Sequence, residues 1–84
     1  MPETKKELKV KVETRPETIY EGVAYSLSSI NDVGKFDILP NHANFISIIQ
    51  ERLVIRKKDG STHELPINQG ILKASNNEVK VYLD

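Results

Sequence analysis

The feature that most limits how this chain can fold is an alternation of apolar and polar side chains near both of its ends. Apolar residues occupy every second position from Leu8 to Val12 and again from Val79 to Leu83, with Lys9, Lys11, Lys80 and Tyr82 between them. A period of two places successive side chains on opposite faces of a β-strand. Both segments are therefore predicted to be strands with one buried face.

Turn signals divide the stretch between these two strands into further short segments. Arg15-Pro16 ends the first strand, Asn31–Gly34 predicts a turn, and Asp59-Gly60 between two extended runs predicts a hairpin. Asn68–Gly70 and Asn76-Asn77 predict two more turns. The series predicts an all-β fold, a small β-sandwich of roughly 8–10 short strands with no long helix.

Some segments carry less regular signals. Residues 45–53 fit a helical face as well as a strand, although their β-branched content favours a strand. The run from Ile19 to Ile30 is rich in strand-forming residues and contains Gly22, which suggests a bulge or a close backbone approach. Pro66 within a strand-like run indicates an edge strand or an irregular ladder.

Length and composition limit the class of protein. A chain of 84 residues allows one domain, spanning residues 1–84. Twelve basic and twelve acidic residues give a net charge of zero, so no overall field attracts nucleic acid or anionic lipid. The chain has no cysteine and no apolar run near the ~20 residues of a membrane span, which predicts no disulfide, no thiolate metal site and no membrane insertion.

The residues that carry chemistry are few. His42 and His63 are the only histidines, and neither lies in a recognisable catalytic or metal-binding motif. No glycine-rich phosphate loop is present. The clusters Lys5–Lys11 and Arg56–Lys58 are diluted by nearby acids and are interpreted as solvated strand faces and edge protection. We therefore expect a binding protein with no catalytic site, no metal and no cofactor.

The most distinctive stretch is Gly34–Ala43, in which a short strand leads into an apolar-x-Pro-x-His-Ala loop. It resembles the signature of the epsilon subunit of F-type ATP synthase (delta in mitochondria), where an apolar strand follows, here residues 45–49. Further segments resemble successive strands of the family's N-terminal β-sandwich domain: residues 8–12, 19–24, 53–56, 69–74 and 79–84.

The resemblance implies a structural subunit of the central stalk that binds the gamma subunit and the c-ring and couples proton-driven rotation to ATP synthesis. It places the protein peripherally on the cytoplasmic side of an energy-transducing membrane. The implied c-ring-facing loop contains these candidate contacts: Asn31, Asp32, Lys35, Asn41 and His42.

The chain also departs from the family's pattern. Lys35 stands where an acidic residue is common, and Asn41 and Asn44 stand where glycine and proline are usual. Family members continue into two C-terminal helices with regulatory functions, which no residues here match; whether the chain's end is natural stays open. A free-standing sandwich that binds a peptide or a small ligand is the alternative, because a fold does not fix a function.

Overall fold

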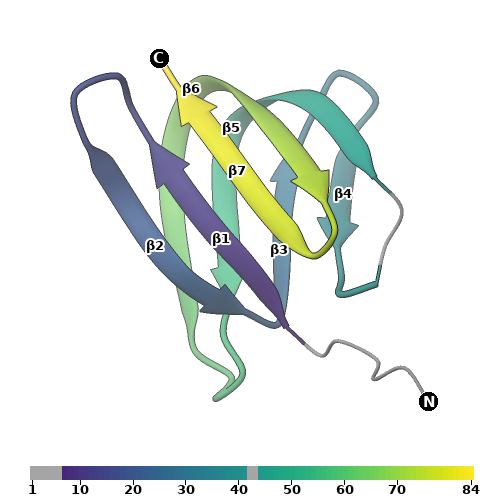
Figure 1. Cartoon of the computed structure of the whole chain (residues 1–84). Coiled ribbons are helices and arrows are strands. Elements are labelled where there is room, and N and C mark those ends of the chain that lie inside the picture. The colour runs from purple at the N-terminus through teal and green to yellow at the C-terminus, as the bar shows by residue number, and fades with distance from the viewer. Residues whose placement is uncertain (1–6, 42–43) are drawn as a thin grey trace.

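The computed structural model describes residues 7–41 and 44–84, which contain seven strands and no helix. The strands are β1 (Leu8–Glu13), β2 (Thr18–Ala24), β3 (Ser26–Ile30), β4 (Lys35–Ile38), β5 (Phe45–Arg56), β6 (Thr62–Ser75) and β7 (Glu78–Leu83). They form one hydrogen-bonded sheet in the order β2-β1-β7-β6-β5-β3-β4 (Figure 1). The all-β prediction is confirmed, and residues 45–53 are strand rather than helix.

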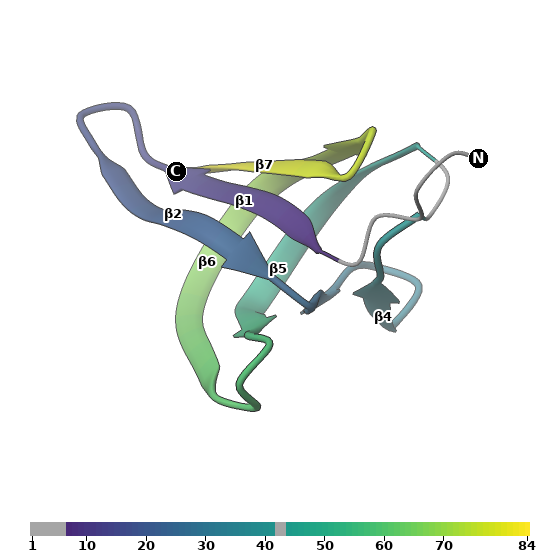
Figure 2. The ribbon, with the colours of Figure 1, turned by 60° about the horizontal axis from the view of Figure 1, so that its bottom comes forward.

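The single sheet folds over on itself because β5 and β6 are long and bent. They contain 12 and 14 residues, and Figure 2 shows both curving from the layer of β1, β2 and β7 toward the layer of β3 and β4. The second half of β6, from Gly70, pairs with β7, whereas its first half pairs only with β5. The fold thus has seven strands, where eight to ten short ones were expected, because β5 and β6 each contribute to both layers.

The bend replaces a turn that the sequence predicted at Asn68–Gly70. These residues lie inside β6, so that prediction is wrong. Gln50 pairs with Gln69 but Glu51 pairs with Ile67, which leaves Asn68 as an extra residue in the ladder. Glu51 has a φ of 72° and is exposed, so the bulge turns a charged side chain outward between two core positions of β5.

Two of the less regular signals are explained by the pairing. Pro66 lies in the first half of β6, which has β5 on one side and no hydrogen-bonded strand on the other, so the predicted edge position is confirmed. The run from Ile19 to Ile30 is not continuous. It divides at Tyr25 into β2, which pairs with β1, and β3, which pairs with β4 and β5.

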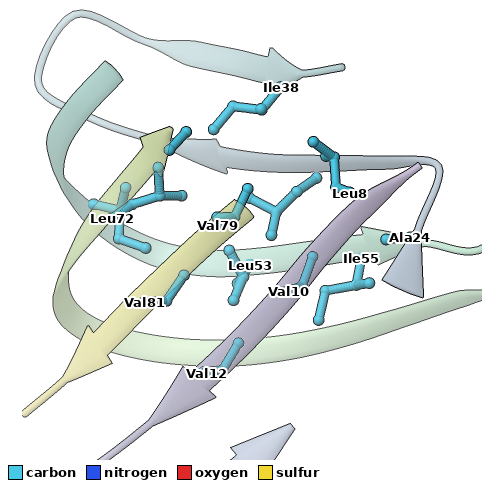
Figure 3. Packing of buried hydrophobic residues seen from close by; sticks show 13 residues of the cluster. Leu8, Val10, Val12, Ala24, Ile38, Leu53, Ile55, Leu72, Val79 and Val81 are labelled. Carbon is cyan, nitrogen blue, oxygen red and sulfur yellow. The ribbon is translucent and has the colours of Figure 1, made fainter. Parts of the chain in front are cut away.

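The core lies between the two layers and receives side chains from every strand (Figure 3). Its buried members are Leu8, Val10, Val12, Ala24, Leu27, Ile38, Ile49, Leu53, Ile55, Leu72, Ala74, Val79 and Val81. Both alternating segments contribute, since β1 and β7 pair in parallel and set Val10 beside Val79 and Val12 beside Val81. Full burial of each valine, leucine or isoleucine side chain stabilises the fold by about 1.5–3 kcal/mol relative to exposure.

Aromatic contacts span the two open sides of the sandwich. Tyr20 of β2 stacks on His63 of β6, with ring centroids 5.4 Å apart, although β2 and β6 share no ladder. On the other side Phe36 of β4 packs against Phe45 of β5, with centroids 5.2 Å apart. Ring contacts of this kind hold sheet edges together where no backbone hydrogen bonds do.

Candidate partner-binding surfaces

The β3–β4 hairpin carries three of the five residues expected in the partner-facing loop: Asn31, Asp32 and Lys35. Ile30 pairs with Lys35, and the backbone N–H of Asn31 donates to the carbonyl of Gly34 at 3.0 Å, so only Asp32 and Val33 form the tip. Gly34 has a φ of 143°, which an L-residue rarely adopts. The predicted turn is therefore a tight, well-defined hairpin.

The Asn31 side chain makes three hydrogen bonds that hold this hairpin. Its Oδ1 accepts the backbone N–H groups of Val33 at 2.9 Å and Gly34 at 3.1 Å, and its Nδ2 donates to Ser47 Oγ of β5 at 3.1 Å. An asparagine that bonds the backbone two and three residues ahead fixes a turn in one conformation. Asn31 therefore positions the tip of the hairpin.

The tip itself is open to solvent. Asp32 and Lys35 are exposed, and Val33 is 90% exposed, the largest fraction among the exposed large apolar side chains of the described residues. Val33 lies at the tip with Asp32 before it and Lys35 two positions after it, and its exposed side chain contributes nothing to the core of this domain. The tip is a compact candidate contact in which Val33 joins the predicted Asp32 and Lys35.

The other two predicted residues do not lie on this tip. Asn41 follows β4, whose four residues separate it from the hairpin by about 13 Å of extended chain. Its backbone N–H donates to Asn77 Oδ1 at 2.7 Å, and Asn77 Nδ2 donates back to Asn41 Oδ1 at 3.4 Å. Asn41 thus joins the β6–β7 turn, at the opposite end of β4. His42 lies outside the described residues.

A second candidate surface was not identified from the sequence. It lies on the outer side of the layer that contains β1, β2 and β7, which β5 and β6 extend. Six exposed residues, here named the outer face, form it: Ile46, Ile48, Ile71, Lys73, Lys80 and Tyr82. The sequence does contain an indication of this surface, because residues at both alternating positions of Phe45–Ile49 are largely apolar. A strand that is apolar on both faces is typical of one covered on both faces.

The groups able to do chemistry are dispersed. Within residues 7–41 and 44–84, no three histidine or carboxylate side chains come close enough to hold a metal ion. His63 is exposed, and its ring stacks on Tyr20. Asp59 has a lowered pKa because Ser61 Oγ and the Ser61 backbone N–H donate to its carboxylate at 2.6 and 2.8 Å, and Lys57 adds a smaller effect. These contacts fit the turn of the β5–β6 hairpin.

No helix able to span a membrane occurs in the part of the chain that the structure describes. What the arrangement offers a partner is therefore a rigid hairpin tip and a partly apolar sheet face.

Comparison with known proteins gives the family. A family model described as ATP synthase, delta/epsilon chain, β-sandwich domain, matches residues 7–84. The ATP synthase epsilon chain of Clostridium botulinum (strain Eklund 17B / Type B) is 32% identical over 74 residues, which cover 87% of this chain and 55% of that protein. The epsilon chain of Sulfurimonas denitrificans is 28% identical over 78 residues, which cover 92% of this chain and 60% of that protein.

Solved structures show the same fold at much lower identity. A chain of the Euglena gracilis mitochondrial ATP synthase, solved as OSCP/F1/c-ring, matches with a TM-score of 0.90 and 12% identity, over 98% of this chain and 53% of that one. A chain of the Tetrahymena thermophila central stalk/c-ring structure matches with a TM-score of 0.74 and 11% identity, over 98% and 66%.

This chain spans 55% and 60% of the length of the two bacterial relatives. The family model nevertheless covers every described residue of the fold. The resemblance of the Gly34–Ala43 stretch to the epsilon signature is confirmed on that basis. The chain belongs to the family of ATP synthase delta/epsilon chains and contains their β-sandwich domain.

Proposed function

We propose that this chain is a non-catalytic component of the central stalk of a rotary F-type ATP synthase, where it binds the gamma subunit and the c-ring. In this role it transmits rotation between the proton-driven ring and the catalytic subunits. The observation that carries the proposal is the match of the family model over residues 7–84. The two solved relatives support it, because their structures are of ATP synthase assemblies that include the c-ring.

The β3–β4 hairpin is the proposed c-ring contact. Its tip is rigid, exposed and placed at an end of the sandwich, where contact with a partner leaves the core undisturbed. Lys35 has no carboxylate within 4 Å among the described residues, so its charge is available to an acidic or neutral partner. The protein then lies peripherally on the aqueous side, proposed as cytoplasmic, of an energy-transducing membrane.

The test is capture of a purified gamma–c-ring assembly by the immobilised chain at several salt concentrations. Lys35→Glu reverses one charge at the hairpin and is expected to slow association and change its salt dependence, because rim charges act mainly on the association rate. Lys58→Glu is the matched control. It makes the same charge change in the β5–β6 loop, at the opposite end of the sandwich (Figure 1), and disturbs only an exposed 3.9 Å pair with Glu7.

The outcomes separate the site from the function. Capture by the parent and by Lys58→Glu, with slower capture by Lys35→Glu, supports both. Capture by Lys35→Glu that equals the parent at every salt concentration rejects the hairpin as the contact. No capture by the parent rejects the stalk function itself.

A further inference from the structure

The outer face places a line of apolar side chains across three strands. Ile48 of β5 lies opposite Ile71 of β6, which lies opposite Tyr82 of β7. These side chains are 59%, 50% and 45% exposed, and Ile46, two positions from Ile48, is 68% exposed. Two strand spacings make the row about 10 Å long, close to the ~11 Å of two α-helical turns.

A row of lysines runs beside the apolar row. Lys73 of β6 lies opposite Lys80 of β7, which lies beside Lys11 of β1. Like charges directly opposite each other across a ladder destabilise a sheet. Lys11 has Glu13 at 3.8 Å, whereas Lys73 and Lys80 have no carboxylate within 4 Å among the described residues.

The surface beside Lys80 is hollowed on both sides. Toward β6 a shallow hollow of about 230 Å³ reaches Lys73 and Tyr82. Toward β2 an open groove of about 380 Å³ is lined by Lys9, Lys11 and Lys80 and also by two acids, Glu21 and Glu78. Glu78 borders the first hollow as well, so four lysines and two glutamates line the two depressions, and the excess of positive charge favours an acidic side chain there.

We propose that the outer face binds an acidic amphipathic α-helix of a stalk partner. The inference rests on the proposed function for the existence of that partner and adds the face and the chemistry by which it is held. Apolar residues one helical turn apart lie on Ile48, Ile71 and Tyr82, and carboxylates on the flank of the helix lie on Lys73 and Lys80. Charge complementarity selects an acidic helix over a neutral or basic one.

The test uses the full chain, labelled with ¹⁵N, and a hydrocarbon-stapled 15-residue helical peptide. The peptide has leucines on one stripe and glutamates on its flank; its control has lysines in place of the glutamates. We expect amide shifts confined to residues 46–48, 71–73 and 80–82 with the acidic peptide, and about tenfold weaker binding between 50 mM and 500 mM salt. The lysine peptide is expected to produce no shifts there.

Variants separate binding from folding. Lys80→Glu is expected to weaken peptide binding at least tenfold yet raise the melting temperature by about 2–5 °C, because it relieves like-charge repulsion. Ile71→Gln removes the centre of the apolar row and is expected to weaken binding without unfolding the chain, since Ile71 is half exposed. Lys58→Glu, at the far end of the sandwich, is expected to bind as the parent does.

Several results overturn the inference. They are no shifts with the acidic peptide at 1 mM, shifts elsewhere, equal binding of both peptides, or unchanged binding by Lys80→Glu. Stronger binding to phosphatidylglycerol vesicles than to the peptide assigns the face to a membrane surface instead, and a dimer through this face in sedimentation assigns it to a second copy. If the chain captures the gamma–c-ring assembly but does not bind the peptide, this inference is rejected and the proposed function stands. If the chain binds the peptide but does not capture the assembly, the proposed function is rejected and the peptide-binding face stands.

Discussion

Gly70 and Leu83 face each other across the β6–β7 ladder so closely that no side chain fits at position 70. A β-carbon built on Gly70 lies 2.8 Å from Leu83 Cδ2 and 2.9 Å from the carbonyl oxygen of Tyr82. Because one of these atoms is backbone, Gly70→Ala must push β7 away from β6. We expect it to lower the free energy of unfolding by about 1–3 kcal/mol, measured by urea denaturation.

Gly22→Ala is the matched control for this loss. The three atoms nearest to a β-carbon there all belong to the Tyr20 side chain, whose hydroxyl oxygen lies 3.3 Å away and can move. We expect its effect to stay within about 0.5 kcal/mol, like an ordinary surface change. Equal losses at both positions contradict the assignment of Gly70 to a close approach of two strands.

Gly70 also separates what local sequence patterns determine in this fold from what they do not. The alternation at Leu8–Val12 and Val79–Leu83 predicted both strands, because a shift of one residue in the pairing register would expose their apolar side chains. Asn68–Gly70 carries the residue types of a turn, yet it lies within β6. The need for glycine there comes from Tyr82 and Leu83 of β7, which are distant from position 70 in the sequence.

The candidate site was likewise predictable from the sequence only in part. The turn at Asn31–Gly34 was predictable, because asparagine and glycine have local reasons to be there. By contrast, the bond from Asn31 to Ser47 and the bond from Asn41 to Asn77 join residues that are distant in sequence. Local patterns do not contain that information.

Asn31→Ala tests the hairpin anchor. It removes two acceptor contacts to backbone N–H groups and the donor to Ser47, and we expect a loss of about 1–2 kcal/mol in unfolding free energy. Asn31→Asp keeps both acceptor contacts and loses only the Ser47 bond, so its loss is expected to be smaller. Calorimetry of both variants measures this; an alanine variant as stable as the parent contradicts the anchoring role.

Tyr20 and His63 are expected to couple energetically across the open side of the sandwich. A double-mutant cycle with Tyr20→Leu and His63→Ala is predicted to give a coupling of about 0.5–1.5 kcal/mol, because the rings stack at 5.4 Å. The reference cycle pairs Tyr20→Leu with Lys73→Ala on the outer face, where no coupling is expected. A zero value for the Tyr20–His63 cycle argues against ring stacking as a link between β2 and β6.

The pKa of Asp59 gives a pH prediction. Donation from Ser61 lowers this pKa in the folded protein. A lowered folded pKa stabilises the protein above the unfolded pKa, and the stabilisation is lost as the pH falls through the folded value. We therefore expect Ser61→Ala to raise the Asp59 pKa toward its ordinary value, as followed by carboxyl-carbon NMR. An unchanged titration midpoint shows that the Ser61 hydroxyl is not the cause.

The central claim is that the β3–β4 hairpin faces the c-ring within an assembled ATP synthase. Because the chain contains no cysteine, Val33→Cys introduces a single thiol at the exposed tip, to which a benzophenone photo-crosslinker is attached. After incorporation into the intact enzyme and irradiation, mass spectrometry identifies the cross-linked partner. The account predicts cross-links to c subunits from position 33 and none from a probe at Lys58→Cys. Cross-links from position 33 to no c subunit, in an enzyme that contains the labelled chain, would contradict it.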